Sequence, residues 1–164
     1  MKITLLAAAD KNNGLGINNR LPWKIPSDLK HFFRFTKNKT ILMGRTTFDG
    51  LPNKLKNRNI IVLTSNKKFR SEGIITANSI EQAISYAVSN GVQDLIVCGG
   101  GMVYKSLISL SDYIVITRVN TVVDKCDTFF PFIDNKIFTQ VDNMEVATDE
   151  NDEHDYVIEK WVKK

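Results

Sequence analysis

The sequence predicts an α/β fold: an eight-stranded, mostly parallel β-sheet flanked by four helices, with a C-terminal antiparallel hairpin. Eight short apolar and β-branched runs recur along the 164 residues. Several of these runs lack polar alternation, which is typical of strands buried on both faces of a sheet. Helical segments lie between the runs, and this alternation of strands and helices favours a mostly parallel sheet.

The strands are expected, in chain order, at Ile3–Ala9, Thr40–Met43, Asn59–Thr64, Gly73–Thr76, Asp94–Cys98, Tyr113–Val119, Phe138–Val146 and Asp155–Val162. The last two runs flank Asp149–Asp155, which holds five acidic residues in seven. We therefore expect a closing antiparallel hairpin with a solvated acidic loop.

The helices are expected at Ser27–Lys37, in a short segment beginning near Arg45, at Ser79–Asn90 and at Gly101–Leu110. The first begins directly after Pro26, a residue that suits the start of a helix. The third has a capping box in Ser79 and Gln82 and ends at Gly91. The fourth follows a run of three glycines.

The length and composition indicate one globular domain spanning residues 1–164. Two cysteines, Cys98 and Cys126, are too few for a disulfide framework or a zinc site, so we expect no metal and a reduced, cytoplasmic setting. The apolar run Ile3–Ala9 is too short for a signal peptide. No run approaches the roughly 18 residues of a membrane span, so no membrane partner is expected.

The charge is unevenly distributed along the chain. Residues 1–70 hold 15 Lys and Arg against 3 acids, a net charge of +12, whereas residues 71–164 hold 7 against 15, a net charge of −8. This asymmetry predicts an anionic partner near the first half. A basic nucleic-acid-binding module is one alternative, but the aromatic residues have core-like spacing and no known binding motif appears.

Three predicted turns at strand ends carry groups that suit a phosphate. Gly99–Gly101 lies between a strand and a helix, where backbone amides can bind an anion. Met43–Thr47 adds an arginine and two hydroxyl groups, and Leu63–Ser65 ends another strand. The run is not the dinucleotide-binding motif Gly-x-Gly-x-x-Gly, because its third glycine would fall at Tyr104. Taken alone, a turn needed only for tight packing explains the glycines equally well. The three turns together favour a ligand at the carboxyl edge of the sheet.

One carboxylate stands out among apolar residues. Asp28 and Phe32 are four residues apart and share a helix face that Leu29 borders. An acidic residue in the first turn of a helix is electrostatically ordinary. If Asp28 instead faces an apolar pocket, its pKa rises and it can bind a ligand with adjacent N–H donors. His31 is expected to be a surface or hydrogen-bonded histidine rather than a catalyst.

Taken in order, the motifs Leu21-Pro-Trp-x-x-Pro-x-Asp28, Met43-Gly-Arg-x-Thr47, Arg58 and Gly99-Gly-Gly-x-x-Tyr104 resemble those of the dihydrofolate reductase family. The resemblance extends over essentially the whole chain. It implies an enzyme that reduces 7,8-dihydrofolate to 5,6,7,8-tetrahydrofolate with NADPH, with hydride transfer to C6 and protonation at N5. The enzyme alternative is a related NADPH-dependent pyrimidine reductase of riboflavin synthesis, which Arg58 and the element ending at Asp28 disfavour.

The resemblance also implies roles for individual residues. Asp28 matches the family's pocket carboxylate, which binds the pterin and promotes protonation of N5, and Thr117 matches the hydroxyl that orients it. Leu21 and Trp23 belong to the same catalytic group. Arg58 would pair with the α-carboxylate of the glutamate tail. The remaining substrate contacts implied are Leu6, Ala7, Leu29, Phe32, Leu51, Leu55 and Cys98.

For NADPH, the implied contacts come from the strand ends and from a loop at Asn12–Lys24 that closes over the nicotinamide. They are Ala8, Leu15, Gly16, Asn19, Leu21, Gly44, Arg45, Thr46, Thr47, Leu63, Thr64, Ser65, Cys98, Gly99, Gly100, Gly101, Met102, Val103 and Tyr104. Arg45, Thr46 and Ser65 would surround the 2′-phosphate. The family pattern also implies a cis peptide between Gly99 and Gly100.

The chain departs from the family pattern beside the folate tail and at the adenosine phosphate. Gly50 replaces a usual serine, and Lys54 and Lys56 replace two prolines, so we hypothesise that these lysines attract the tail carboxylates. Met102 stands where some members carry arginine. The resemblance further implies a monomer that binds a small-molecule substrate and antifolate inhibitors, without a nucleic-acid partner.

Overall fold

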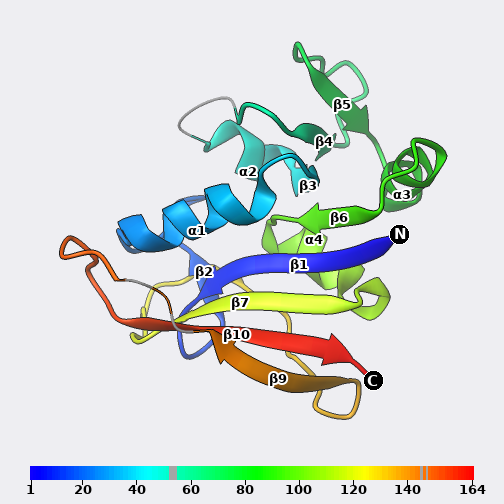
Figure 1. Cartoon of the computed structure of the whole chain (residues 1–164). Coiled ribbons are helices and arrows are strands. Elements are labelled where there is room, and N and C mark those ends of the chain that lie inside the picture. The colour runs from blue at the N-terminus through cyan, green and yellow to red at the C-terminus, as the bar shows by residue number, and fades with distance from the viewer. Residues whose placement is uncertain (52–54, 145, 147) are drawn as a thin grey trace.

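The computed structural model describes residues 1–51, 55–144, 146 and 148–164. Eight strands form one sheet in the order β5-β4-β3-β6-β1-β7-β10-β9 (Figure 1). They are β1 (Lys2–Ala9), β3 (Thr40–Gly44), β4 (Asn59–Leu63), β5 (Ile74–Ala77), β6 (Asp94–Val97), β7 (Tyr113–Val119), β9 (Phe138–Met144) and β10 (Tyr156–Lys163).

Only β10 breaks the parallel direction of this sheet: it pairs antiparallel with both β7 and β9. The described part of the chain also forms four α-helices, α1 (Pro26–Thr36), α2 (Arg45–Asp49), α3 (Ile80–Ser89) and α4 (Gly101–Leu107), and a 3-10 turn, η1 (Ile108–Leu110). The predicted α/β class, the eight strands, the four helices and the C-terminal antiparallel pair are therefore confirmed.

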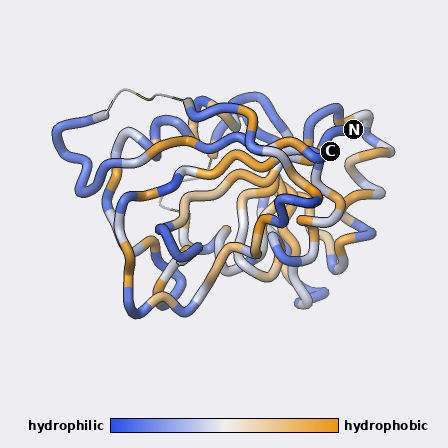
Figure 2. The backbone as a smooth tube through the Cα atoms, turned by 90° about the horizontal axis from the view of Figure 1, so that it is seen from below, coloured by the Kyte–Doolittle hydropathy of each residue, from blue (hydrophilic) through white to orange (hydrophobic). Residues whose placement is uncertain are grey.

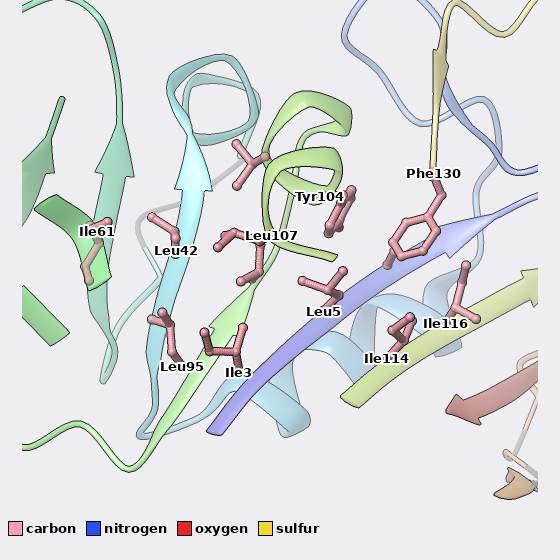
Figure 3. Close-up of a cluster of buried hydrophobic side chains, with 14 of the residues drawn as sticks. Ile3, Leu5, Leu42, Ile61, Leu95, Tyr104, Leu107, Ile114, Ile116 and Phe130 are labelled. Carbon is pink, nitrogen blue, oxygen red and sulfur yellow. The ribbon is translucent and has the colours of Figure 1, made fainter. Parts of the chain in front are cut away.

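The sheet is buried on both faces because alternate residues of the strands point to opposite sides. On β1, Ile3, Leu5 and Ala7 belong to the cluster that packs under α3 and α4, whereas Leu6 faces the cluster under α1 and α2. Figure 3 shows the first cluster, with Tyr104 of α4 above the strands. The hydrophobic stretches accordingly follow the inner strands in Figure 2. Two-sided burial explains why these strands read as unbroken apolar runs.

Local signals account for the helix ends. The backbone N–H of Gln82 donates to the side chain of Ser79 at 3.1 Å, so the predicted cap of α3 is present. Gly91 follows the helix with φ of +68°, a conformation that glycine adopts without strain. None of the helices in these described ranges is long and apolar enough to cross a bilayer.

A second, two-stranded sheet was not expected from the sequence. It pairs β2 (Gly14–Gly16) with β8 (Thr128–Phe129), over 110 residues apart in the chain. Such short strands carry little periodic signal, so only the long-range pairing defines them. This ladder ties the segment after β1 to the segment before β9.

Candidate active site

The carboxyl ends of β1, β3, β4 and β6 meet at one edge of the main sheet, because these strands are mutually parallel neighbours. The loop after Ala9, the turn after β3, the segment Leu63–Ser65 and the glycine run all follow these strand ends. The three turns whose groups suit a phosphate therefore lie at the same edge of the sheet, which is where open α/β sheets bind ligands.

The turn after β3 and the glycine run are in direct contact. The N–H of Gly44 donates to the carbonyl of Gly99 at 2.8 Å. A Cβ on Gly100 would lie 3.3 Å from the Thr47 hydroxyl oxygen, and one on Gly44 would lie 3.4 Å from Val103. Glycine thus brings two backbones and a hydroxyl together without intervening side chains. The peptide between Gly99 and Gly100 is cis, as the family resemblance implied.

The polar side chains around these turns differ in how they are held. The Nε of Arg45 lies 2.7 Å from an Asp49 carboxylate oxygen, and its guanidinium lies 4.0 Å from the centre of the Phe69 ring. Thr46 and Ser65 are exposed. The Arg45 guanidinium is thus held by Asp49 of the same helix and by the Phe69 ring.

The first turn of α4 has one exposed side chain, Met102, and two buried ones, Val103 and Tyr104. Met102 is 77% exposed, whereas Val103 and Tyr104 are buried. The Tyr104 hydroxyl donates to the carbonyl of Leu6 at 2.6 Å, which ties α4 to β1. Thr64 is buried at the end of β4, next to half-buried Leu63.

Asp28 lies in the first turn of α1, with its carboxylate directed to β7. The Thr117 hydroxyl donates to Asp28 Oδ1 at 2.6 Å. Burial raises the pKa of Asp28 from its ordinary value of 3.8 to about 6, against the Thr117 hydrogen bond, which lowers it, and with a further rise from the charge of Asp152. The raised pKa and the partial burial are the features that a functional role of Asp28 requires, as opposed to an ordinary helix-start acid.

The face of the sheet that α1 covers is apolar. Leu6 and Cys98 belong to the buried cluster against which Phe32, Leu51 and Leu55 pack. Burial raises the pKa of the Cys98 thiol to about 12, so it stays protonated at neutral pH. Of the other predicted substrate contacts, Ala7 is buried and Leu29 is 46% exposed.

Trp23 is buried in a small cluster with Ile25 and Val119, against which Ala8 packs. Within the described residues, its indole Nε1 is a buried donor without a hydrogen-bond partner. Buried polar groups are nearly always paired with protein, water or ligand. Leu21, two residues earlier, is 61% exposed. The segment ending at α1 therefore combines a buried indole with an exposed leucine.

The loop between β1 and α1 is organised by Asp10, which sequence reasoning missed. Asp10 is 1% exposed, and its carboxylate accepts backbone N–H groups of Asn12, Gly14 and Val123 at 2.7–2.8 Å. Three charge-assisted hydrogen bonds of this kind fix a turn strongly. An Asp at the end of a strand is a weak signal by itself, because one of its partners, Val123, lies 113 residues away in the chain.

The same loop carries three further predicted NADPH contacts besides Leu21. Leu15 and Gly16 lie on β2, and Leu15 packs against the main core. Asn19 is exposed and has φ of +62°. A Cβ on Gly50 would lie 3.8 Å from the Asn19 carbonyl oxygen, so the loop approaches the end of α2.

Arg58 is anchored to the C-terminal end of α1. Its Nε donates to the Thr36 hydroxyl at 2.9 Å, Nη2 to the Phe33 carbonyl at 2.7 Å, and Nη1 to the Lys56 carbonyl at 2.6 Å. A guanidinium has five N–H donors, so one remains on each Nη nitrogen. Lys54 lies outside the described residues.

One expectation near α1 is wrong. His31 is neither exposed nor hydrogen-bonded: it is half-buried on Phe35, and its Nε2 lacks a partner among the described residues. Burial, together with Arg34, lowers its pKa. The acidic loop is mostly exposed, as expected, but Asp152 and Glu153 also accept hydrogen bonds from Ser27 and Lys24. The sequence gives no sign of these contacts, because they join segments 125 or more residues apart.

Comparison with known proteins decides the family. The family model described as dihydrofolate reductase matches residues 2–163. The chain belongs to the dihydrofolate reductase family. It is 39% identical over 132 residues to the dihydrofolate reductase of Buchnera aphidicola subsp. Acyrthosiphon pisum, covering 80% of each chain. It is 30% identical over 162 residues to that of Bacillus subtilis, covering 99% of this chain and 95% of the relative.

A solved structure agrees with this assignment. The dihydrofolate reductase from Enterococcus faecalis, complexed with NADP(H) and RAB-propyl, superposes with a TM-score of 0.90 at 32% identity. The match covers 99% of this chain and 96% of that one. The predicted family is therefore confirmed. The chain is an oxidoreductase of the dihydrofolate reductase family, and the pyrimidine-reductase alternative is set aside.

Proposed function

We propose that this chain reduces 7,8-dihydrofolate at the pocket around Asp28 and takes NADPH along the edge formed by the two glycine turns. In balance, dihydrofolate, NADPH and one proton give tetrahydrofolate and NADP⁺. The observation that carries the proposal is a half-buried carboxylate with a raised pKa, hydrogen-bonded to Thr117 at 2.6 Å, on the helix that covers the apolar cluster of Leu6 and Cys98. Family membership and the names of the relatives support the reaction.

Asp28 would bind the pterin and promote its protonation. With a pKa of about 6, it is roughly nine-tenths ionised at pH 7 and can accept hydrogen bonds from the 2-amino group and N3. Its negative charge stabilises a protonated pterin and so favours proton uptake at N5 from water. Thr117 holds the carboxylate in place for this role. Leu21 and Trp23 would complete this group, with the unpaired indole N–H of Trp23 available to a ligand or water.

The apolar residues around Asp28 would bind the flat rings of the substrate. Leu6 and Cys98 would form a buried floor, and Leu29, Phe32, Leu51 and Leu55 would enclose the pterin and aminobenzoyl rings. The side chain of Ala7 belongs to the cluster on the opposite face of the sheet, so Ala7 would contact the substrate through its backbone. Such walls exclude water, which strengthens the electrostatic interactions of the carboxylate.

The second site fits the cofactor. NADPH supplies the hydride when bound. The cradle where Gly44, Gly99 and Gly100 meet Thr47 offers backbone groups and a hydroxyl with no side chains between them, as a diphosphate requires. Gly101, Met102, Val103 and Tyr104 would continue this contact along α4. Arg45, Thr46 and Ser65 would surround the 2′-phosphate, with Leu63 and Thr64 beneath it. Ala8, Leu15, Gly16, Asn19 and Leu21 would contact the nicotinamide side.

The glutamate tail of the substrate would lie in a groove at the C-terminal end of α1. The groove has a volume of about 520 Å³ and is lined by Phe33, Arg34, Lys37 and Leu55–Arg58. The two free N–H groups of Arg58 suit a carboxylate. Lys56 adds charge at the rim, and we propose that it and Lys54 attract the tail. Replacing both by Gln should raise the KM for dihydrofolate at low salt, with the effect fading at high salt; an unchanged KM would contradict this role.

The reaction is tested by following the loss of NADPH absorbance after dihydrofolate is added. The wild type should turn over, and Asp28→Asn should lose about 100-fold or more in kcat/KM at neutral pH. Glu150→Gln removes an equal charge from an exposed position and should retain full activity. Equal rates for the wild type and Asp28→Asn would refute the role of Asp28. We further propose that the chain acts as a single-domain monomer, which sedimentation can check, and that antifolate inhibitors compete for this pocket.

A further inference from the structure

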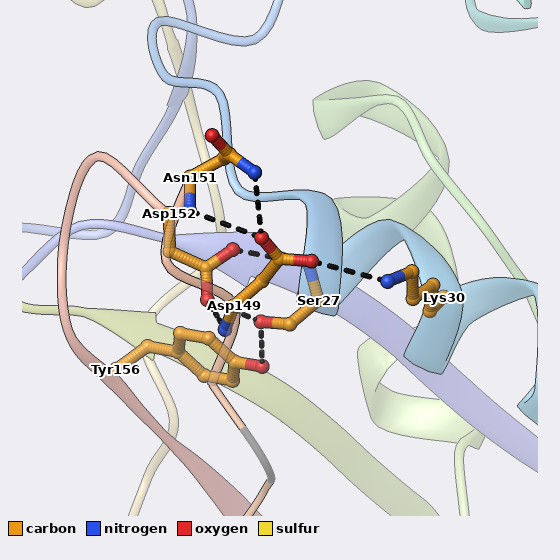
Figure 4. Close-up of polar contacts among 6 residues, drawn as sticks. All are labelled: Ser27, Lys30, Asp149, Asn151, Asp152 and Tyr156. Carbon is orange, nitrogen blue, oxygen red and sulfur yellow. Dashed lines mark hydrogen bonds and ion pairs between the residues drawn. The ribbon is translucent and has the colours of Figure 1, made fainter.

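The first turn of α1 is held from outside the helix by the acidic loop. Its N-cap residue, Ile25, makes no side-chain hydrogen bond, and Pro26 has no N–H to offer. The first available helix amide is that of Ser27, and it donates to Asp152 Oδ1 at 3.1 Å. The Ser27 hydroxyl lies 2.6 Å from Asp152 Oδ2 (Figure 4). One carboxylate therefore binds both polar groups of Ser27 and caps the helix.

Tyr156 of β10 extends this contact. Its hydroxyl lies 2.6 Å from the Ser27 hydroxyl. Ser27 has one hydroxyl proton, and an ionised carboxylate only accepts, so Ser27 donates to Asp152 and Tyr156 donates to Ser27. Ser27 is 4% exposed. The result is a directed chain of hydrogen bonds from the sheet, through the helix, to the loop.

The loop is itself braced in the position that presents Asp152. The N–H of Asp149 donates to Asp152 Oδ2 at 2.8 Å, and Lys30 of α1 pairs with Asp149 at 3.1 Å (Figure 4). Although burial opposes ionisation of Asp152, the hydrogen bonds from Asp149 and Ser27 outweigh it and lower its pKa. Asp152 is thus a fixed negative charge at neutral pH.

Ser27 directly precedes Asp28, so two consecutive residues are held by two different parts of the fold. Ser27 is bound by the loop and β10, and Asp28 is bound by Thr117 of β7. We propose that Asp152 is a positioning residue for the reduction: through Ser27 it fixes the first helical turn and so the place of the Asp28 carboxylate. This inference rests on the proposed function, because Asp28 is its target.

The charge of Asp152 has an effect that a purely structural contact would lack: it changes the pKa of Asp28, which can be measured. Its negative charge acts on Asp28, where it adds to the effect of burial and raises the pKa, while the Thr117 hydrogen bond lowers it. The other titratable groups electrostatically coupled to Asp28 are Tyr104 of α4 and Tyr156 of β10.

The cationic side chains of α1 do not offset the effect of the Asp152 charge on the pKa of Asp28. Lys30 is paired with Asp149, and Arg34 acts on His31 and Tyr156. Neutralising Asp152 should therefore lower the midpoint at which Asp28 titrates.

The test compares Asp152→Asn with Glu150→Gln, which removes the same charge from an exposed position of the same loop. The carboxyl carbon of Asp28 is titrated by NMR without substrate, and single-turnover hydride transfer is measured across pH. In Asp152→Asn, the Asp28 midpoint and the rate profile should both move to lower pH by roughly several tenths of a pH unit. Both should stay at the wild-type position in Glu150→Gln.

Ser27→Ala separates tethering from charge, since it keeps Asp152 but removes the hydroxyl that binds it. We expect the single-turnover rate to fall about 3- to 10-fold, with a KM for dihydrofolate that changes less. If Asp152→Asn fails to fold, as circular dichroism would show, this variant carries the test.

The two proposals fail in different ways. A wild type that does not reduce dihydrofolate refutes the proposed function. A wild type with normal turnover, but with Asp28 midpoints and rates that are the same in Asp152→Asn, Glu150→Gln and Ser27→Ala, refutes the role of Asp152 alone.

Discussion

Replacing Asp28 by Asn should make the protein more stable at neutral pH while removing most of its activity. Asn keeps an oxygen that accepts the Thr117 hydrogen bond, but it cannot ionise. The substitution therefore removes the cost of holding a negative charge in an apolar pocket and leaves the packing almost unchanged.

The size of the effect follows from the pKa of Asp28. A rise from 3.8 to about 6, at about 1.4 kcal/mol per pH unit, corresponds to about 3 kcal/mol. Below about pH 4 the carboxyl group is protonated in both states and costs nothing. Between about pH 4 and pH 6 the unfolded chain loses its proton first, so stability falls as pH rises. Above about pH 6 the full cost remains.

The assay is urea unfolding of the wild type, Asp28→Asn and Glu150→Gln between about pH 4 and pH 8. Near pH 4, wild type and Asp28→Asn should have equal free energies of unfolding. At pH 7 Asp28→Asn should be more stable by up to about 3 kcal/mol, whereas Glu150→Gln should follow the wild type throughout. A difference between Asp28→Asn and the wild type that stays constant with pH, or has the opposite sign, would refute the reasoning.

Three further substitutions test the contacts around this pocket. Thr117→Val removes the bond that lowers the pKa of Asp28, so the pH profile of turnover should move to higher pH and the rate at neutral pH should fall about 10-fold; an unmoved profile would contradict this. Gly101→Ala places a Cβ 2.8 Å from the Thr128 methyl carbon and should cost about 1–3 kcal/mol in urea unfolding, unless the strand β8 shifts freely. Tyr104→Phe breaks a buried 2.6 Å hydrogen bond to β1 and should cost about 1–2 kcal/mol, and a neutral result would mean that the carbonyl finds another donor.

The main sheet was predictable from the sequence because its signals are local. The run Tyr113–Val119 is apolar except for Thr117 and Arg118, which favours a strand buried on both faces, and β7 spans those same residues. The helix cap at Ser79 was predictable for the same reason, since its donor and acceptor are three residues apart. Helix α4 ends three residues earlier than expected because its last turn tightens into η1.

The polar contacts that organise the site were not predictable in the same way. Asp10 and Asp152 carry no local sign of their role, since each accepts hydrogen bonds from segments more than 100 residues away. Asp28 was singled out by its apolar helix face and by the motif Leu21-Pro-Trp-x-x-Pro-x-Asp28. Periodicity thus identifies which face of an element is buried, but not which distant donor a carboxylate will meet.

The uneven charge of the chain is partly explained by the residues at the two ends of α1. The acidic loop binds the N-terminal end of this helix, and the basic groove lies at its C-terminal end, both in the sense that the helix dipole favours. Part of the basic first half is thereby matched internally, as in the pair of Lys30 with Asp149. Within the described residues, Arg34, Lys37 and Arg58 of the groove form no ion pair. An external anion is therefore expected at this end of α1 rather than across the whole basic half.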